Sequence, residues 1–311
     1  MTFTIFEFLA NRTALLGFRL TNIDNCSNNQ IILIYKNGGD DSRYISNPKF
    51  AQPKNTNLLP DPGKQNPQGT TFDNQLIELD SVDSTNNYAM GRIHAGLAFD
   101  GMVCLARHQW AGKGHRGKTW SSEPGQNLIM SLVLEPDKLD ISQQFLFSAA
   151  VALAILDLAR RSEKNGWTVK WPNDIYWNDR KAAGILIESI LQGQNWSWAV
   201  VGIGMNLNQD RFPDDVPNAV SLKQITGLDY HPKTLARELV MAIRIRISQL
   251  VENPGSLLQQ FNENLYKKNQ AVGLIRENER IVASIIQVDL SGSLITDIGK
   301  FGPGEIQFIA G

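Results

Sequence analysis

Residues 109–120 hold the densest group of side chains that could do chemistry. Glycines and cationic side chains alternate along this segment, as Gly112, Lys113, Gly114, His115, Arg116, Gly117 and Lys118. Glycine allows backbone conformations with positive φ and lets a ligand approach the main chain closely. Exposed amides among positive side chains suit a phosphate group, and a loop of this composition can fold over a bound ligand. The alternative is a surface loop without function, because a short glycine-rich segment has low specificity on its own.

A lysine at the start of an apolar strand is the second candidate. Residues 169–177 and 181–188 predict a hairpin around a turn at 178–180. The alternation of a strand predicts that Lys181 shares a face with Ala183 and Ile185, while Gly184 opens the other face to close approach. An ammonium group in this place can stabilise a carboxylate and a phosphate that must approach each other. The alternative is a solvated lysine in a turn.

Two further segments carry polar groups next to predicted secondary structure. Ser84, Thr85 and Asn86 precede a predicted helix, whose N-terminus suits a small polar ligand, although simple capping explains them equally well. Residues 202–208 (Gly-Ile-Gly-Met-Asn-Leu-Asn) follow a predicted strand. They lack the third glycine and the following helix of a dinucleotide-binding turn, which argues against a Rossmann fold.

The elements that must position these residues are visible as apolar patterns. The patterns predict strands at 76–79, 101–106, 127–134 and 196–201, a long core helix from 142 or 143 to 164 with Ser142 as its N-cap, and helices at 232–251 and 256–268. Four short strands, at 270–276, 280–288, 293–297 and 305–309, predict a small β-barrel of the SH3-like kind. No run reaches the roughly 18 apolar residues that a membrane span needs.

The first 74 residues differ in character from the rest. Residues 31–35 predict one strand, but closely spaced prolines and polar residues then predict that 38–74 are largely disordered. We interpret 1–74 as a poorly ordered leader. It shows neither the periodicity of a recognition helix nor a basic stripe, and its start lacks the basic region of a secretory signal.

Composition limits the classes of partner. The net charge is -1, from 30 Lys+Arg against 31 Asp+Glu, so we expect neither nucleic acid nor a membrane as partner. Cys26 and Cys104 are too few for a disulfide framework or a metal cluster, which favours a reducing compartment and a cytoplasmic location.

Four motifs in this order resemble the motif set of biotin protein ligases. They are residues 106–117, 170–174 (Lys-Trp-Pro-Asn-Asp), 181–188 (Lys-Ala-Ala-Gly-Ile-Leu-Ile-Glu) and 202–208. Residues 83–86 (Asp-Ser-Thr-Asn) resemble the segment of that family that contacts biotin. The resemblance runs from about residue 75 to the C-terminus and does not cover 1–74.

The resemblance implies a fold and an activity. The implied fold is α+β, with a mixed or antiparallel sheet flanked by helices, like the class II synthetases, over residues 75–267. A small SH3-like β domain follows over 268–311. The implied reaction joins biotin to ATP, which gives biotinoyl-5′-AMP and pyrophosphate, with Mg²⁺ on the triphosphate. The adenylate then acylates a lysine of a biotin carboxyl carrier protein.

The resemblance also implies roles for single residues. The catalytic residues would be Lys181, Lys113, Arg116 and Asp174. Biotin would be bound by Ser84, Thr85, Asn86, Gln109, Gly112, Lys113, Gly114, His115, Trp120, Lys181, Gly184 and Gly204. The nucleotide would be bound by Arg116, Lys118, Asn173, Asp174 and Asn206, and Asp174 would also meet Mg²⁺ through ATP.

The chain departs from the family pattern in the glycine-rich segment, and three alternatives stay open. Many family members carry arginine where this chain has Lys113 and His115, which predicts looser retention of the adenylate. A lipoate protein ligase would use the same acyl-adenylate chemistry, but its Arg-Arg-x-x-Gly-Gly-Gly stretch is not found. A biotin-responsive DNA-binding repressor and an inactive binding module of the same fold are the other two. The choice between monomer and homodimer also stays open.

Overall fold

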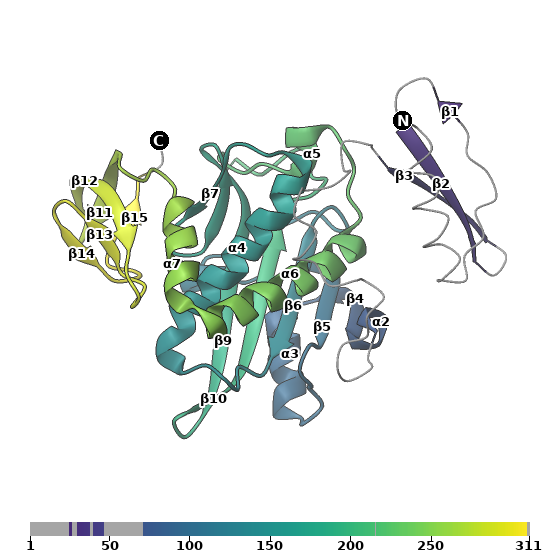
Figure 1. Cartoon of the computed structure of the whole chain (residues 1–311), viewed down its shortest axis with the longest axis horizontal. Coiled ribbons are helices and arrows are strands. Elements are labelled where there is room, and N and C mark those ends of the chain that lie inside the picture. Colours follow the sequence, from purple (N-terminus) through teal and green to yellow (C-terminus); the bar gives the residue numbers. More distant parts are fainter. Residues whose placement is uncertain (1–24, 27–29, 38–39, 47–70, 215, 310–311) are drawn as a thin grey trace. The chain divides into compact units, whose positions relative to one another are not determined.

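The structure is a computed structural model that describes residues 25–26, 30–37, 40–46, 71–214 and 216–309 (Figure 1). The chain divides into two compact units, residues 1–64 and 65–311. In the first unit, β1 (Asn25–Cys26), β2 (Gln30–Asn37) and β3 (Asp40–Ser46) form an antiparallel sheet.

Strand β2 contains the strand predicted at 31–35, which is confirmed. Strand β3 lies where the composition predicted disorder, because its backbone pairs with β2 residue by residue from Ile31↔Ser46 to Asn37↔Asp40. Cross-strand pairing here overrides a polar composition. The predicted absence of a winged helix concerns residues that lie largely outside the described ranges.

The second unit contains one large sheet, its helices and a smaller sheet (Figure 1). In chain order the elements are α2 (Phe72–Gln75), β4 (Leu76–Val82), α3 (Thr85–His94), β5 (Val103–Gln109), the 3₁₀ turn η2 (His115–Gly117), β6 (Leu128–Leu134), the 3₁₀ turn η3 (Ile141–Gln143), α4 (Gln144–Ser162), β7 (Trp167–Lys170), β8 (Asp174–Trp177), β9 (Arg180–Gln192), β10 (Asn195–Met205), α5 (Leu222–Thr226), α6 (Pro232–Glu252), α7 (Pro254–Glu263), β11 (Ala271–Arg276), β12 (Glu279–Val288), β13 (Leu294–Thr296), β14 (Gly299–Phe301) and β15 (Gln307–Phe308).

The large sheet has the strand order β4-β5-β6-β10-β9-β8-β7, and only the β4–β5 pair is parallel. Helices cover both of its faces. Figure 1 shows α4 and α6 lying across one face, while α3 packs on the other through a cluster that includes Ala89, Cys104 and Val133. A strand that is buried on both faces has no polar face, which explains the apolar run Val103–Ala106 in β5 and the almost entirely apolar β6. This mixed sheet flanked by helices is the predicted fold class.

Helix α4 is the centre of the core. Its residues from Ala149 to Ile155 are all buried, and Phe147 packs edge-to-face on Trp196 with ring centroids 5.1 Å apart. The segment Ile141–Ser162 is long and apolar enough to cross a membrane by composition, but 61% of its most apolar window is buried inside the protein, as in a core helix. The predicted cap at Ser142 is wrong. Asp140 caps the preceding turn instead, because its carboxylate accepts from the Ser142 amide at 2.8 Å.

The smaller sheet, at the C-terminus, has the order β14-β13-β12-β11-β15 and is antiparallel throughout. It confirms the predicted small β domain and adds β14, which the pattern did not reveal. The segment after β14 brings residues 304 and 306–308 to the cavity described next.

Candidate active site

One cavity of about 1030 Å³ collects the segments singled out in the sequence. Its wall is formed by the start of α3, the glycine-rich segment 113–121, the ends of β6, β9 and β10, the 170–174 connection and residues 304 and 306–308 of the C-terminal domain. Segments next to the large sheet and next to the smaller C-terminal sheet therefore meet at one site. We call residues 112–118 the lid from here on.

The inner end of the cavity is a buried polar network. Gln109 Oε1 accepts from the backbone amide of Thr85 at 2.7 Å and from its hydroxyl at 3.0 Å. An amide proton can only be donated, so the oxygen of the Gln109 side chain must face Thr85, and its NH₂ group must face the other way. A β-carbon at Gly112 would lie 2.7 Å from that nitrogen and would overlap the backbone carbonyl oxygen of Trp120, so residue 112 has to be glycine.

Ser131 supports this network from behind. It is fully buried in β6, and its hydroxyl lies 2.7 Å from Thr85 Oγ1 and 2.6 Å from Asn86 Oδ1. The amide nitrogen of Asn86 donates to Glu188 Oε2 at 2.7 Å and to the carbonyl of Leu186 at 3.3 Å. Both polar atoms of the Asn86 side chain are thus engaged within the protein, and it fixes α3 against β6 and β9.

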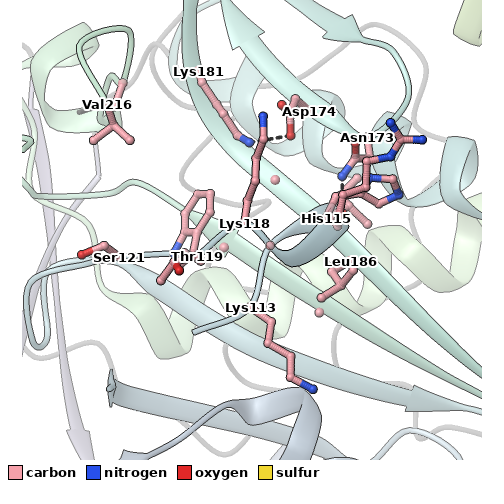
Figure 2. Close-up of a pocket in the computed structure, with 18 of the residues that line it drawn as sticks. Lys113, His115, Lys118, Thr119, Ser121, Asn173, Asp174, Lys181, Leu186 and Val216 are labelled. Carbon is pink, nitrogen blue, oxygen red and sulfur yellow. Dashed lines mark hydrogen bonds and ion pairs between the residues drawn. The ribbon is translucent and has the colours of Figure 1, made fainter. Parts of the chain in front are cut away.

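Lys181 and Asp174 form the charged centre of the cavity. Their side chains make an ion pair with 2.6 Å between Nζ and Oδ1, and Figure 2 shows Lys118 pointing from the lid toward the same pair. The pair is partly exposed, with 33% of the Lys181 side chain and 25% of the Asp174 side chain open to solvent. It is therefore open to ligand from the cavity side.

The predicted facing of Lys181 is wrong, and a β-bulge is the reason. Ile175 pairs with Ala183 and the next residue, Tyr176, pairs with Lys181, so Ala182 is an extra residue in β9. A bulge of one residue reverses the alternation of side chains along a strand. As a result Lys181 lies on the same side as Gly184, with its Cε 3.4 Å from the position of a β-carbon at residue 184.

Trp120 covers two glycines of the cavity wall. A β-carbon at Gly204 would overlap the indole ring, and one at Gly184 would lie 3.2 Å from it. The ammonium group of Lys181 lies 5.7 Å from the ring centroid. The indole Nε1 is buried without a hydrogen-bond partner among the described residues. Because residues 184 and 204 have no side chain, the indole ring of Trp120 can lie directly against the two strands.

The lid is a short closed loop. Lys113 pairs with Thr119 as an isolated bridge, and the Gly114 amide donates to the Lys118 carbonyl at 2.6 Å. Arg116 has φ 61, a left-handed conformation that is uncommon outside glycine. Burial, followed by the charge of Arg116, lowers the pKa of His115. The lid therefore carries a histidine that is largely neutral at pH 7.

Lys170 is a cation in an aromatic cage. Its Nζ donates to the Tyr176 hydroxyl at 3.1 Å and lies 4.6, 5.6 and 5.1 Å from the ring centroids of Tyr176, Tyr266 and Phe308. Burial lowers the pKa of this ammonium group. Because Phe308 belongs to β15, the cage joins the catalytic domain to the C-terminal domain at the cavity.

The structure brings the predicted site residues together with one exception. All of them line the cavity except Gly112, which is buried behind it. The lysine amine at 181 and the lid share this cavity, as the chemistry requires.

Sequence reasoning missed Ser131, the caging of Lys170, and the cavity residues Gly304, Ile306, Gln307 and Phe308. For Ser131 the available signal was a single hydroxyl within the otherwise apolar strand 128–134.

The described residues contain no group of three or more His, Cys, Asp or Glu side chains that could hold a metal ion. Asp174 is the only carboxylate among the described residues that line the cavity. Mg²⁺ is commonly held by one or two carboxylates together with substrate phosphates. The donor set fits an Mg²⁺ ion that enters with a nucleotide.

Comparisons with known proteins show which proteins this chain resembles. The chain matches the model of the biotin/lipoate A/B protein ligase family over residues 78–206. The bifunctional ligase/repressor BirA of Escherichia coli is 30% identical over 223 residues, which are 70% of this chain and 68% of that protein. The biotin–[acetyl-CoA-carboxylase] ligase of Mycobacterium tuberculosis is 28% identical over 232 residues, covering 72% of this chain and 84% of that protein. The fold resembles a biotin protein ligase of Aquifex aeolicus in complex with biotin and ATP, with a TM-score of 0.65, 23% identity and coverage of 76% of this chain and 99% of that one. The chain therefore belongs to the biotin/lipoate A/B protein ligase family, and the predicted resemblance to its biotin protein ligases is confirmed.

Proposed function

We propose that this protein is an ATP-dependent biotin ligase, which activates biotin as biotinoyl-5′-AMP and transfers it to a lysine of a carrier protein. One observation carries the proposal: a buried polar network and a strongly cationic surface face each other across a single cavity. Among the residues that the structure describes, five cationic side chains line it, against one carboxylate: Lys113, Arg116, Lys118, Lys170 and Lys181. In a chain with net charge -1, such a local excess of positive charge suits a triphosphate.

The polar network supports biotin over lipoate as the acid. Biotin carries a ureido ring with N–H donors and a C=O acceptor, whereas the dithiolane ring of lipoate has neither. The NH₂ group of Gln109 and the hydroxyl groups of Ser84 and Thr85 can bond to the ureido group. A dithiolane would leave such buried groups without partners, at about 1–3 kcal/mol each.

In the first step, a carboxylate oxygen of biotin attacks the α-phosphorus of ATP, and pyrophosphate leaves with the electron pair of the broken P–O bond. Two anions must meet, so their repulsion is the main barrier that the site has to lower. Lys181 is held between the polar network and the lid, where its ammonium group stabilises both anions. Mg²⁺ bound with ATP would neutralise part of the triphosphate charge, and Asp174 is the cavity carboxylate that would hold it.

In the second step, a lysine amine of the carrier attacks the carbonyl carbon of the mixed anhydride, and AMP leaves. The lid shields this hydrolysable intermediate from water until the carrier arrives. We assign the carrier to the biotin carboxyl carrier domain of a biotin-dependent carboxylase, because relatives are named as ligases of acetyl-CoA carboxylase. A cytoplasmic location and a possible homodimer belong to the same proposal.

The test is incubation of the protein with ATP, Mg²⁺ and either biotin or lipoate, with pyrophosphate release and the mass of the acyl-adenylate as readouts. Biotin should give both products, and addition of an apo carrier domain should then give a biotinylated carrier. Turnover with lipoate but not with biotin would show that the acid substrate is lipoate and not biotin. Absence of turnover with both acids would reject the ligase function.

A further inference from the structure

The side chain of Arg116 in the lid touches the C-terminal domain at Gly304. A β-carbon at Gly304 would lie 2.6 Å from Nη1 of Arg116 and would overlap the rest of the guanidinium group. The guanidinium therefore lies directly on the bare backbone of residue 304. Any other residue type would occupy the space that the Arg116 side chain now fills.

This contact is made by shape rather than by an ion pair. Among the described cavity residues, Lys113 pairs with Glu188 and Lys181 with Asp174, but no described carboxylate lies within 4.0 Å of Arg116. The adjacent acid, Glu305, is engaged elsewhere, because its Oε2 accepts from the Gly302 amide at 3.0 Å. The contact thus leaves the charge of Arg116 available to an anionic ligand.

The turn at 302–305 is itself firmly placed. The Glu305 amide donates to the Gly302 carbonyl at 3.1 Å, and Gly304 has φ +102, a conformation that favours glycine. Ile306 follows directly and is buried. Residues 307–308 form β15, whose Phe308 lies at the cage of Lys170. A lid that rests on this turn is therefore held in a fixed position relative to the cavity wall.

We propose that Gly304 is a positioning residue for the lid: the bare turn at 302–305 seats the Arg116 guanidinium and so keeps the lid closed over the acyl-adenylate. The inference rests on the proposed function for its substrate. It gives the C-terminal domain a role in retaining the intermediate, through a residue that acts by holding the Arg116 side chain of the lid.

The test is a double-mutant cycle on the release of bound biotinoyl-5′-AMP from the enzyme. Gly304→Ala should speed release about tenfold, which corresponds to about 1.4 kcal/mol. Arg116→Ala should also speed release, and the double variant should be no faster than Arg116→Ala alone, because the added methyl group then meets no guanidinium. Additive effects in the double variant, or unchanged release in Gly304→Ala, would overturn the proposal.

Two controls separate loss of the seat from backbone strain and misfolding. Gly299→Ala lies in the same domain at φ +150 with no neighbour within 4 Å, so it adds strain without touching the lid, and release should be unchanged. Faster release in this control would assign the effect to strain. If Gly304→Ala does not fold, Arg116→Lys is used in its place, because a lysine keeps the charge but lacks the flat guanidinium group. Release of the adenylate from Arg116→Lys at the wild-type rate would reject the proposed role of Gly304.

The contact between Arg116 and Gly304 can also be tested if the proposed ligase function is wrong. If the wild-type protein forms no adenylate, hydrogen exchange of the lid amides still tests the seat without any ligand. Faster exchange at residues 114–118 in Gly304→Ala than in Gly299→Ala would support the seat, and equal exchange would reject it.

Discussion

Replacing Lys181 by methionine removes the positive charge at the centre of the cavity while keeping a side chain of similar length. The ammonium group now lies 2.6 Å from Asp174 and faces the space that the carboxylate of biotin and the α-phosphate must share. Its loss leaves two reacting anions and the Asp174 carboxylate without the cation between them. Formation of the adenylate should therefore slow more than substrate binding weakens.

The size of the effect follows from the geometry. Two unit charges about 4 Å apart interact by about 4 kcal/mol at an effective dielectric constant of about 20. The Lys181 side chain is 33% exposed, so water screens part of this energy. We expect a loss of about 3 kcal/mol, which corresponds to roughly a 100-fold slower first step.

The assay is single-turnover pyrophosphate release with saturating biotin and ATP. The second step is measured separately by supplying synthetic biotinoyl-5′-AMP and an apo carrier domain, and it should change much less. Lys223→Met is the matched control, because Lys223 forms exposed ion pairs with Asp210 and Asp229 and does not line the cavity. A Lys181→Met enzyme that releases pyrophosphate within a factor of three of the wild type would refute the electrostatic role.

Three further predictions follow from neighbouring groups. Burial lowers the pKa of His115, so its imidazole becomes charged only below the ordinary value of about 6.5; adenylate release should slow as the pH falls from about 8 to about 5.5, whereas His115→Arg should release slowly throughout. Ser131→Ala removes a buried hydroxyl that bonds in the polar network; the KM for biotin should rise about tenfold and the free energy of unfolding should fall by about 1–3 kcal/mol, as read by denaturant titration. Gly204→Ala would displace the ring of Trp120 and should raise the KM for biotin by at least about tenfold, whereas Gly91→Ala, which has no neighbour within 4 Å, should leave it unchanged.

The sequence alone predicted the elements whose patterns are local. Strands β5 and β6 stand out because both of their faces are buried, and α6 stands out because Leu239, Ile243 and Leu250 repeat at helical spacing and are all buried. The motif order then placed nearly all of the site residues around one cavity, because the ends of these elements meet there.

The remaining features depend on pairings between distant parts of the chain. The bulge at Ala182 arises only when β9 pairs with β8, so simple alternation placed Lys181 on the wrong face. Strand β14 has three residues, too few for a pattern, and exists through its pairing with β13. The seat at Gly304 requires the C-terminal turn and the lid to meet across 188 positions of chain between residues 116 and 304, and no local pattern encodes such a contact.

The indole of Trp120 also supplies a natural spectroscopic probe. It stands in the cavity wall over Gly204, and the mostly buried Trp171 lines the same cavity, whereas Trp167 and Trp196 are enclosed in the core. The emission of an indole responds to the polarity around it, and a vitamin-sized molecule in the cavity changes the solvent near this ring but not near the enclosed ones. Occupancy of the cavity can therefore be followed by fluorescence on the unlabelled protein, without a coupled assay or a radioactive substrate.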